Sequence, residues 1–207
     1  MKLIENNKFG HVLVEGSGTD NKVFFISDTH FGHKNIIKSC ERPFGSVEEM
    51  DNALIENWNS VVAEDCIIFI LGDFCWTHKA STWKNLIDTL NGDKVLIMGN
   101  HDDKKIIKAL KDDFLIEPRE RLTITINGSN KMVLDHFPQY EWSGSRHGTI
   151  HLFGHIHQKD SPIARVNSYN VSVERNYYRP ISLKEVNNAI EKQKRENKVN
   201  LALNDCE

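Results

Sequence analysis

Residues 22–30 read Lys22-Val-Phe-Phe-Ile-Ser-Asp-Thr-His30, an apolar run that ends in a carboxylic acid and an imidazole. A short continuous apolar run of this kind is typical of a strand that is buried on both faces. We therefore predict a buried strand over residues 22–27. Asp28 and His30 then lie just beyond its carboxyl end, at the edge of an open sheet where ligands gather.

The same arrangement recurs at four more predicted strands, 66–71, 94–98, 131–135 and 149–153. The metal-capable side chains that follow these strands are Asp73, Asn100, His136, His155 and His157. Chance would scatter such residues over both edges of the sheets, so we expect them to meet in one site. The glycines at positions 72, 99 and 154 let the backbone turn tightly beside bound ions.

Carboxylates, imidazoles and a carboxamide together suit ions such as Mn²⁺, Fe²⁺ or Zn²⁺ without any thiolate. One carboxylate can bridge two cations, and two ions roughly 3.5–4 Å apart can clamp the attacking and leaving oxygens of a phosphoryl group. The pattern thus predicts a site that can hold two metal ions. The alternative, in which polar residues at strand ends merely cap turns, explains Asp28 or Asn100 singly but does not explain all five clusters.

In chain order the motifs are D-x-H, G-D, G-N-H-D, H and G-H-x-H, and together they resemble the calcineurin-like metallophosphoesterase superfamily over residues 22–173. The segments Asp28–His33 and Tyr178–Ser182 are similar to a small, single-domain bacterial and phage branch of that family. Protein Ser/Thr phosphatases of the family carry an Asp-Arg pair shortly after the G-D element. This chain lacks the pair, which argues against phosphoprotein as its dedicated substrate.

The resemblance implies a role for each ligand. One metal is held by Asp28, His30 and His157, and the other by Asn100, His136 and His155. Asp73 bridges the two ions. His101 protonates the leaving oxygen or stabilises the transition state, and Asp102 orients the His101 imidazole, as carboxylates beside a metal site orient imidazoles.

Four residues outside the ligand set are candidates for contact with the substrate: His33, Arg42, Trp76 and Arg146. His33 could equally be plain surface, and Arg42 fits an Arg-Pro turn before a helix as well as a phosphate contact. Trp76 follows the bridging carboxylate closely enough to line the pocket. Arg146 lies in loop 143–148, from which an arginine can grip phosphate.

The remaining pattern predicts an α/β fold of two packed mixed β-sheets flanked by helices, with the dimetal site at the strand carboxyl ends. Helices are expected at 46–60, 81–90 and 104–110, and further strands at 11–15, 122–126 and 169–173. The 207 residues fit a single domain, 1–207, which carries the motifs in 22–173 and a C-terminal helix over 183–198.

Composition limits the function only broadly. A net charge of -3 gives no general attraction for nucleic acid or anionic membranes, although it does not exclude a nucleotide substrate. Residues 1–8 lack the apolar stretch of a signal peptide, and the longest apolar run, 66–71, is too short to span a bilayer. We therefore expect a cytoplasmic protein with reduced cysteines.

These observations predict a metal-dependent hydrolase that cleaves phosphate mono- or diesters by attack of a metal-bound hydroxide at a dinuclear centre. The expected cofactors are two divalent ions per chain, with Mn²⁺ ahead of Fe, Zn, Ni, Co and Mg. The expected partner is a phosphate-ester substrate, nucleotides included, with no membrane and no obligate protein partner. Two alternatives stay open: a nucleotide-specific phosphodiesterase or nuclease, and a non-catalytic interaction scaffold, although such scaffolds usually lose His101 or a ligand.

Overall fold

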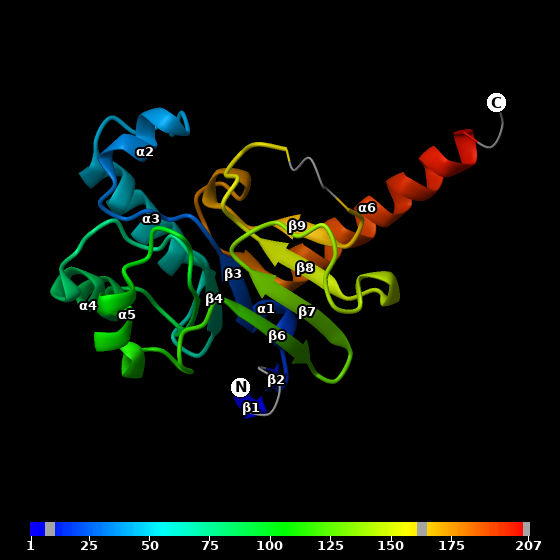
Figure 1. Cartoon of the computed structure of the whole chain (residues 1–207), viewed down its shortest axis with the longest axis horizontal. Coiled ribbons are helices and arrows are strands. Elements are labelled where there is room, and N and C mark those ends of the chain that lie inside the picture. Colours follow the sequence, from blue (N-terminus) through cyan, green and yellow to red (C-terminus); the bar gives the residue numbers. More distant parts are fainter. Residues whose placement is uncertain (7–10, 161–164, 205–207) are drawn as a thin grey trace.

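Two β-sheets stacked face to face, with helices on their outer sides, form the protein (Figure 1). The computed structural model describes residues 1–6, 11–160 and 165–204. The predicted α/β fold of two packed mixed sheets flanked by helices is confirmed. Within the described ranges, no helix is long and apolar enough to cross a membrane.

The apolar runs predicted as buried strands form the centre of a four-stranded sheet. Its strands, in spatial order, are β10 (Ile181–Ser182), β3 (Val23–Ile26), β4 (Ile67–Leu71) and β5 (Asp93–Ile97). β3, β4 and β5 are parallel, and β10 pairs antiparallel with β3. Successive side chains of a strand face opposite sides of the sheet, and both sides are buried here, which explains why β3 and β4 are apolar throughout.

The second sheet has six strands. In spatial order they are β1 (Lys2–Asn6), β2 (His11–Glu15), β6 (Arg121–Ile126), β7 (Asn130–Asp135), β8 (Ile150–Phe153) and β9 (Ser168–Asn170). β7, β8 and β9 are parallel, whereas β6 and β7 form an antiparallel hairpin. At its turn Asn127 and Gly128 have φ angles of 46° and 70°, left-handed values that let the chain reverse sharply.

Helices and short 3-10 turns complete the fold. They are α1 (Thr19–Lys22), α2 (Lys34–Ser39), α3 (Val47–Val61), α4 (Ala80–Thr89), α5 (Lys104–Ala109), α6 (Leu183–Asn204), η1 (Lys111–Asp113), η2 (Ser145–His147) and η3 (Val173–Arg175). α3 begins where the sequence predicted, because the Ser46 hydroxyl accepts a hydrogen bond from the backbone N–H of Glu49 (3.1 Å). α2 to α5 gather on one side of the molecule and α6 on the other (Figure 1).

Two hydrophobic cores hold these layers together. The core between the sheets includes Phe25 and Phe69, with Val186 from α6. The core between the four-stranded sheet and α2–α5 includes Trp58 and Trp83, both fully buried. Side chains of β3, β4 and β5 enter both cores alternately, so these three strands are the best-anchored part of the fold.

The structure differs from the sequence-based prediction mainly at short or peripheral elements. The strands β1 and β10 and the helices α1 and α2 were not predicted, because each has at most six residues and depends on tertiary packing. The predicted strand 169–173 ends at Asn170, and η3 follows it. The C-terminal helix continues beyond residue 198 to Asn204.

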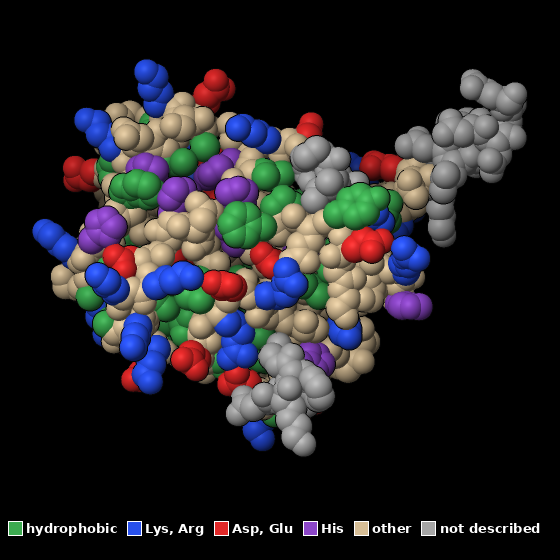
Figure 2. All heavy atoms as spheres, in the orientation of Figure 1, with side chains coloured by type: hydrophobic (Ala, Val, Ile, Leu, Met, Phe, Trp, Pro, Cys, Tyr) green, Lys and Arg blue, Asp and Glu red, His purple; other side chains and the backbone are tan. Residues whose placement is uncertain are grey.

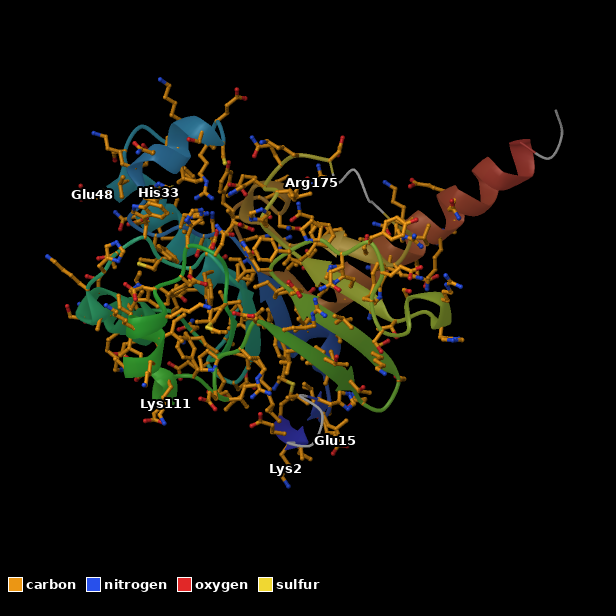
Figure 3. The ribbon with its side chains drawn as sticks, in the orientation of Figure 1. Lys2, Glu15, His33, Glu48, Lys111 and Arg175 are labelled. Carbon is orange, nitrogen blue, oxygen red and sulfur yellow. The ribbon has the colours of Figure 1, made fainter. Side chains whose placement is uncertain are left out.

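The two sheets meet at the edge where the predicted ligands lie. The Ser27 backbone N–H donates to the Val171 carbonyl, and the Val173 N–H donates to the Ser27 carbonyl, both at 3.1 Å. This parallel bridge places the carboxyl end of β3 beside that of β9. Since β3–β5 and β7–β9 are parallel sets, their carboxyl ends all point toward one region, at the far end of the sheets from Lys2 and Glu15 (Figure 3).

Candidate metal centre

The backbone is left-handed at most of the predicted ligands. Positive φ angles occur at Asp28 (59°), His30 (50°), Asp73 (54°), His155 (69°) and His157 (52°). Residues other than glycine seldom adopt this conformation, which costs on the order of 1–3 kcal/mol each and clusters at functional sites. The strained turns therefore mark this edge as a site where side-chain direction matters more than local stability.

Asp28, His30 and His157 form a first group of candidate ligands. One ligand atom from each lies within 4.8 Å of the other two, and His157 Nε2 is 3.9 Å from Asp28 Oδ1. The Asp28 carboxylate is fully buried, and its Oδ2 accepts hydrogen bonds from the hydroxyls of Ser27 (2.6 Å) and Ser172 (2.8 Å). These two bonds fix the orientation of the carboxylate.

Asp73 joins this group to a second one around His136. Its Oδ2 lies 3.5 Å from His30 Nε2 and 3.5 Å from His136 Nε2, so one carboxylate oxygen faces both groups. His136 Nδ1 donates to the last carbonyl of β4 (2.8 Å), which turns Nε2 toward Asn100 Oδ1 (3.0 Å). The His155 ring lies 5.1 Å from the His136 ring. The seven predicted ligands thus come together in one place.

The His30 imidazole shows most directly that the residues fit metal ions. Both of its ring nitrogens are buried, and neither has a hydrogen-bond partner among the described residues. A buried polar atom without a partner is costly and needs an explanation. Burial lowers the pKa of His30 to about 2, so the ring is neutral and keeps a lone pair for a ligand. A divalent ion would satisfy that nitrogen.

Opposite charges concentrate around the shared carboxylate. Burial acts to raise the pKa of Asp73, but the hydrogen bond and charge of His136 outweigh it and lower this pKa to about 2. Burial acts to lower the pKa of His136, but the same carboxylate outweighs it and raises this pKa to about 9. Asp73 is therefore ionised, and His136 would release its proton on binding a cation through Nε2, because an imidazole ligand must be neutral.

Glycines make room for the two acidic ligands. A Cβ at Gly99 would lie 2.3 Å from Asp73 Oδ1, and a Cβ at Gly154 would lie 2.4 Å from Asp28 Oδ2. Neither position tolerates a side chain without displacing a carboxylate. The glycines before Asn100 and His155 are thus required by close approach of the backbone to the site.

Comparison with known proteins agrees with this geometry. The family model described as calcineurin-like phosphoesterase matches residues 21–204. The chain belongs to this family. It is similar to uncharacterized protein MJ1445 of Methanocaldococcus jannaschii, with 40% identity over 84% of this chain and 93% of the relative. It is also similar to the gene 66 protein of Mycobacterium phage L5, with 28% identity over 66% of this chain and 78% of that protein.

A solved structure is also similar. The crystal structure of AQ665, a protein of unknown function from Aquifex aeolicus, superposes with a TM-score of 0.64 at 27% sequence identity. The match covers 81% of this chain and 98% of the Aquifex chain. The family therefore supports a metal-dependent phosphoesterase, whereas these relatives leave the substrate open.

Arg42 does not have the position predicted for a substrate contact in this phosphoesterase. Its side chain is wholly buried and donates from Nη2 to Glu174 Oε1 (2.6 Å). It also donates to the carbonyls of Asp28 (2.6 Å) and Thr29 (2.9 Å). The predicted phosphate contact is wrong, because these partners occupy the guanidinium away from solvent. Arg42 instead stabilises the backbone turn that carries Asp28 and His30.

Glu174 is a candidate functional residue that the sequence did not predict. Its buried Oε1 accepts a hydrogen bond from His157 Nδ1 (2.9 Å) as well as from Arg42. This bond fixes the tautomer of His157 and leaves Nε2 as the ligand atom. Glu174 follows β9 at the same sheet edge as the ligands, so the rule that found the ligands could also have found it.

Asp102 has a different role from the predicted contact with His101. Its carboxylate accepts hydrogen bonds from the backbone N–H groups of Asp73 (3.0 Å), Phe74 (2.8 Å) and Gly99 (2.8 Å). In the described part of the chain it has no hydrogen bond to the His101 imidazole. Burial raises the pKa of Asp102 to about 6. Asp102 thus ties the loop after β4 to the loop after β5 and positions Asp73.

Three side chains lie over the first ligand group. The rings of His33 and Trp76 stack with centroids 3.8 Å apart and an interplanar angle of 5°. The exposed His101 ring lies 5.0 Å from Trp76 and 5.7 Å from His30, while its backbone N–H donates to Asp73 Oδ1 (2.9 Å). The structure therefore brings His33, Trp76 and His101 to the site, as the sequence predicted.

Arg146 lies elsewhere. Its side chain is 81% exposed and forms an ion pair with Glu141 (3.1 Å). Its turn, η2, is the yellow-green segment at the right of Figure 1, away from the helices that border the ligands. The structure thus contradicts the predicted phosphate grip, because η2 packs at the other end of β8 from His155.

Proposed function

We propose that this protein hydrolyses phosphate mono- or diesters at a dinuclear metal centre. The observation that carries the proposal is the position of Asp73, whose Oδ2 is 3.5 Å from the nearest nitrogens of both His30 and His136. One carboxylate oxygen between two groups of ligands is the arrangement that a pair of bridged ions requires. When bound, two such ions activate water and offset the charge of the phosphoryl oxygens.

The residues around the carboxylate divide between two half-sites. Asp28, His30 and His157 would hold one ion, and Asn100, His136 and His155 the other. The donors are nitrogen and oxygen atoms without a thiolate, a set that suits ions such as Mn²⁺, Fe²⁺ and Zn²⁺, and of these we propose Mn²⁺. Cys75 lies near this edge, but burial raises the pKa of its thiol to about 12, so it is not a nucleophile at neutral pH.

His101 supports hydrolysis as the reaction. Its imidazole is exposed beside the half-sites, and its backbone is fixed by the hydrogen bond to Asp73. A substrate phosphate held next to Asp73 would therefore have this ring within reach of one ester oxygen. We assign His101 the transfer of a proton to the leaving oxygen.

A turnover assay tests the proposal. The purified protein, stripped of metal and then supplied singly with Mn²⁺, Ni²⁺, Co²⁺, Mg²⁺ or Zn²⁺, is offered p-nitrophenyl phosphate, bis(p-nitrophenyl) phosphate and cyclic nucleotides. The expected result is hydrolysis that depends on added metal and is abolished in Asp73→Asn. Absence of turnover with every ester and every metal would overturn the proposal in favour of a non-catalytic scaffold.

A further inference from the structure

Two aromatic side chains stand exposed beside the metal centre. Trp76 is 43% exposed and Phe137 is 45% exposed, although large aromatic residues of a monomer are mostly buried. Each follows a ligand closely in the sequence, since Trp76 comes three residues after Asp73 and Phe137 directly after His136. In Figure 2 several histidines gather on one face, with hydrophobic side chains beside them.

The two aromatic rings lie beside different half-sites of the centre. The Trp76 ring is 6.4 Å from the ring of His30, in the first half-site. The Phe137 ring is 4.6 Å from His155 and 5.0 Å from His136, both in the second half-site. Since Asp73 lies between His30 and His136, a phosphorus atom held next to it would have Trp76 beside one half-site and Phe137 beside the other.

Both rings are held in place. Trp76 stacks on His33 and donates its backbone N–H to the Phe31 carbonyl (2.9 Å). The backbone N–H of Phe137 donates to Asp135 Oδ1 (2.9 Å). The Phe137 ring also contacts the rings of His136 and His155. These contacts restrict both aromatic rings, so stacking of a planar group on them loses less entropy than stacking on free side chains.

A cavity continues from the second half-site past Phe137. Its volume is about 650 Å³, and its wall includes Asn100, Phe137 and Gln139. Pockets of roughly 300–1,000 Å³ are the size that small ligands occupy. The amide of Gln139 is already occupied with Asp135, and the wall also includes the charged side chains of Lys104, Glu120, Arg121 and Asp135.

Charge around this cavity favours a small, uncharged group. The two cations at its rim are paired, Lys104 with Glu120 (3.1 Å) and Arg121 with Asp135 (2.7 Å). The whole chain carries a net charge of -3, so there is no field that would attract the many phosphates of a long nucleic acid. A planar neutral group, such as a nucleobase, is compatible with these surroundings.

We infer that the substrate is a small phosphodiester with a planar aromatic group on each side of the scissile phosphate, chemically a dinucleotide. One planar group stacks on Trp76 and the other on Phe137. The inference rests on the proposed function. In the reaction, water adds its oxygen to phosphorus, one P–O ester bond breaks, and the released alcohol takes a proton. The products are one phosphomonoester and one alcohol.

Two synthetic diesters with the same leaving group test the Trp76 and Phe137 rings separately. Bis(p-nitrophenyl) phosphate has a planar group on both sides, whereas methyl p-nitrophenyl phosphate has one. With the metal-loaded protein, Trp76→Ala and Phe137→Ala should each lower kcat/KM for the bis ester about tenfold, a typical effect of losing one stacking partner. For the methyl ester, only one of the two variants should show this loss.

Natural-type substrates and control variants complete the test. Both alanine variants should lose at least as much kcat/KM for thymidylyl-thymidine as for the bis ester. The unsubstituted protein should cleave thymidylyl-thymidine faster, per ester bond, than a 20-nucleotide single strand. Trp76→Phe should retain most of the activity. Tyr140→Ala should leave these rates unchanged, because this tyrosine is 63% exposed and its ring is in contact with the Arg165 guanidinium (4.1 Å).

The outcomes separate this inference from the proposed function. If the unsubstituted protein hydrolyses both esters, but Trp76→Ala and Phe137→Ala lose no activity or lose equally on the bis and methyl esters, the inferred stacking of two planar groups is overturned. The proposed phosphoesterase activity would then still stand. Faster hydrolysis of the 20-nucleotide strand would show that the substrate is a nucleic acid and not a small diester. Absence of all hydrolysis would overturn both. The metal content of each variant is measured alongside. An unchanged metal content shows that a loss of activity comes from the lost substrate contact and not from a damaged metal centre.

Discussion

Substitution of Glu174 tests how the first half-site is built. Glu174 and Arg42 form a buried pair with side chains 3% and 0% exposed. Removal of one partner from such a pair costs about 3–5 kcal/mol, because the other charge stays buried. Arg42 keeps the carbonyls of Asp28 and Thr29 as acceptors. We therefore expect Glu174→Ala to lower the free energy of unfolding by about 3 kcal/mol, the lower end of that range.

The same substitution should weaken one metal site selectively. Without Glu174 the His157 ring loses the hydrogen bond that directs Nε2 to the centre, and loss of such a partner typically lowers metal affinity ~10–100-fold. The half-site of Asn100 and His136 has no contact with Glu174, so its ion should be kept. Glu174→Gln retains an acceptor for His157 Nδ1 and should lose less affinity than Glu174→Ala.

Urea unfolding without metal measures the stability, and calorimetric titration with Mn²⁺ measures both affinities. Glu141→Gln is the matched control, because its partner Arg146 is 81% exposed and a surface change of this kind alters stability by about 0.5 kcal/mol or less. Equal weakening of both metal sites, or unchanged affinity at both with Glu174→Ala, would refute the assigned role of this carboxylate.

Three further substitutions probe the centre. His101→Ala should keep both ions and lower the hydrolysis rate ~10²–10⁴-fold on alkyl or nucleoside esters. The rate on nitrophenyl esters should fall less, because nitrophenolate leaves without a proton. Equal losses on both kinds of ester would contradict proton transfer by His101. Gly99→Ala should lower metal content by displacing the Asp73 carboxylate, whereas Gly45→Ala should not, as elemental analysis can show. Asp102→Ala should lower the free energy of unfolding by roughly 1–3 kcal/mol, because buried N–H donors lose their acceptor; an unchanged urea midpoint would contradict its bracing role.

Much of the fold and the ligand set could be predicted because both depend on local pattern. The runs before Asp28 and Asp73 are apolar at every position, which favours buried parallel strands. Parallel strands bring the residues after their carboxyl ends to one edge, so the ligands could be placed together before their distances were known. The strands β1 and β10 carry weak patterns and form only because a neighbouring strand pairs with them.

The contacts that could not be predicted are long-range or depend on side-chain direction. Arg42 and Glu174 are 132 positions apart, and nothing local to either residue indicates a partner. Asp102 lies next to His101 in the sequence, but its carboxylate points to the amides of other residues. The residue type of Arg146 and its loop favour a phosphate contact, but neither determines at which end of β8 that loop lies.

The central claim is that Asp73 bridges two ions. Anomalous diffraction from crystals grown with Mn²⁺ tests it most directly, because it locates the ions instead of counting them. We predict two peaks roughly 3.5–4 Å apart on either side of the Asp73 carboxylate, one against Asp28, His30 and His157 and the other against Asn100, His136 and His155. A single peak at full occupancy, or two peaks that do not share Asp73, would contradict the claim.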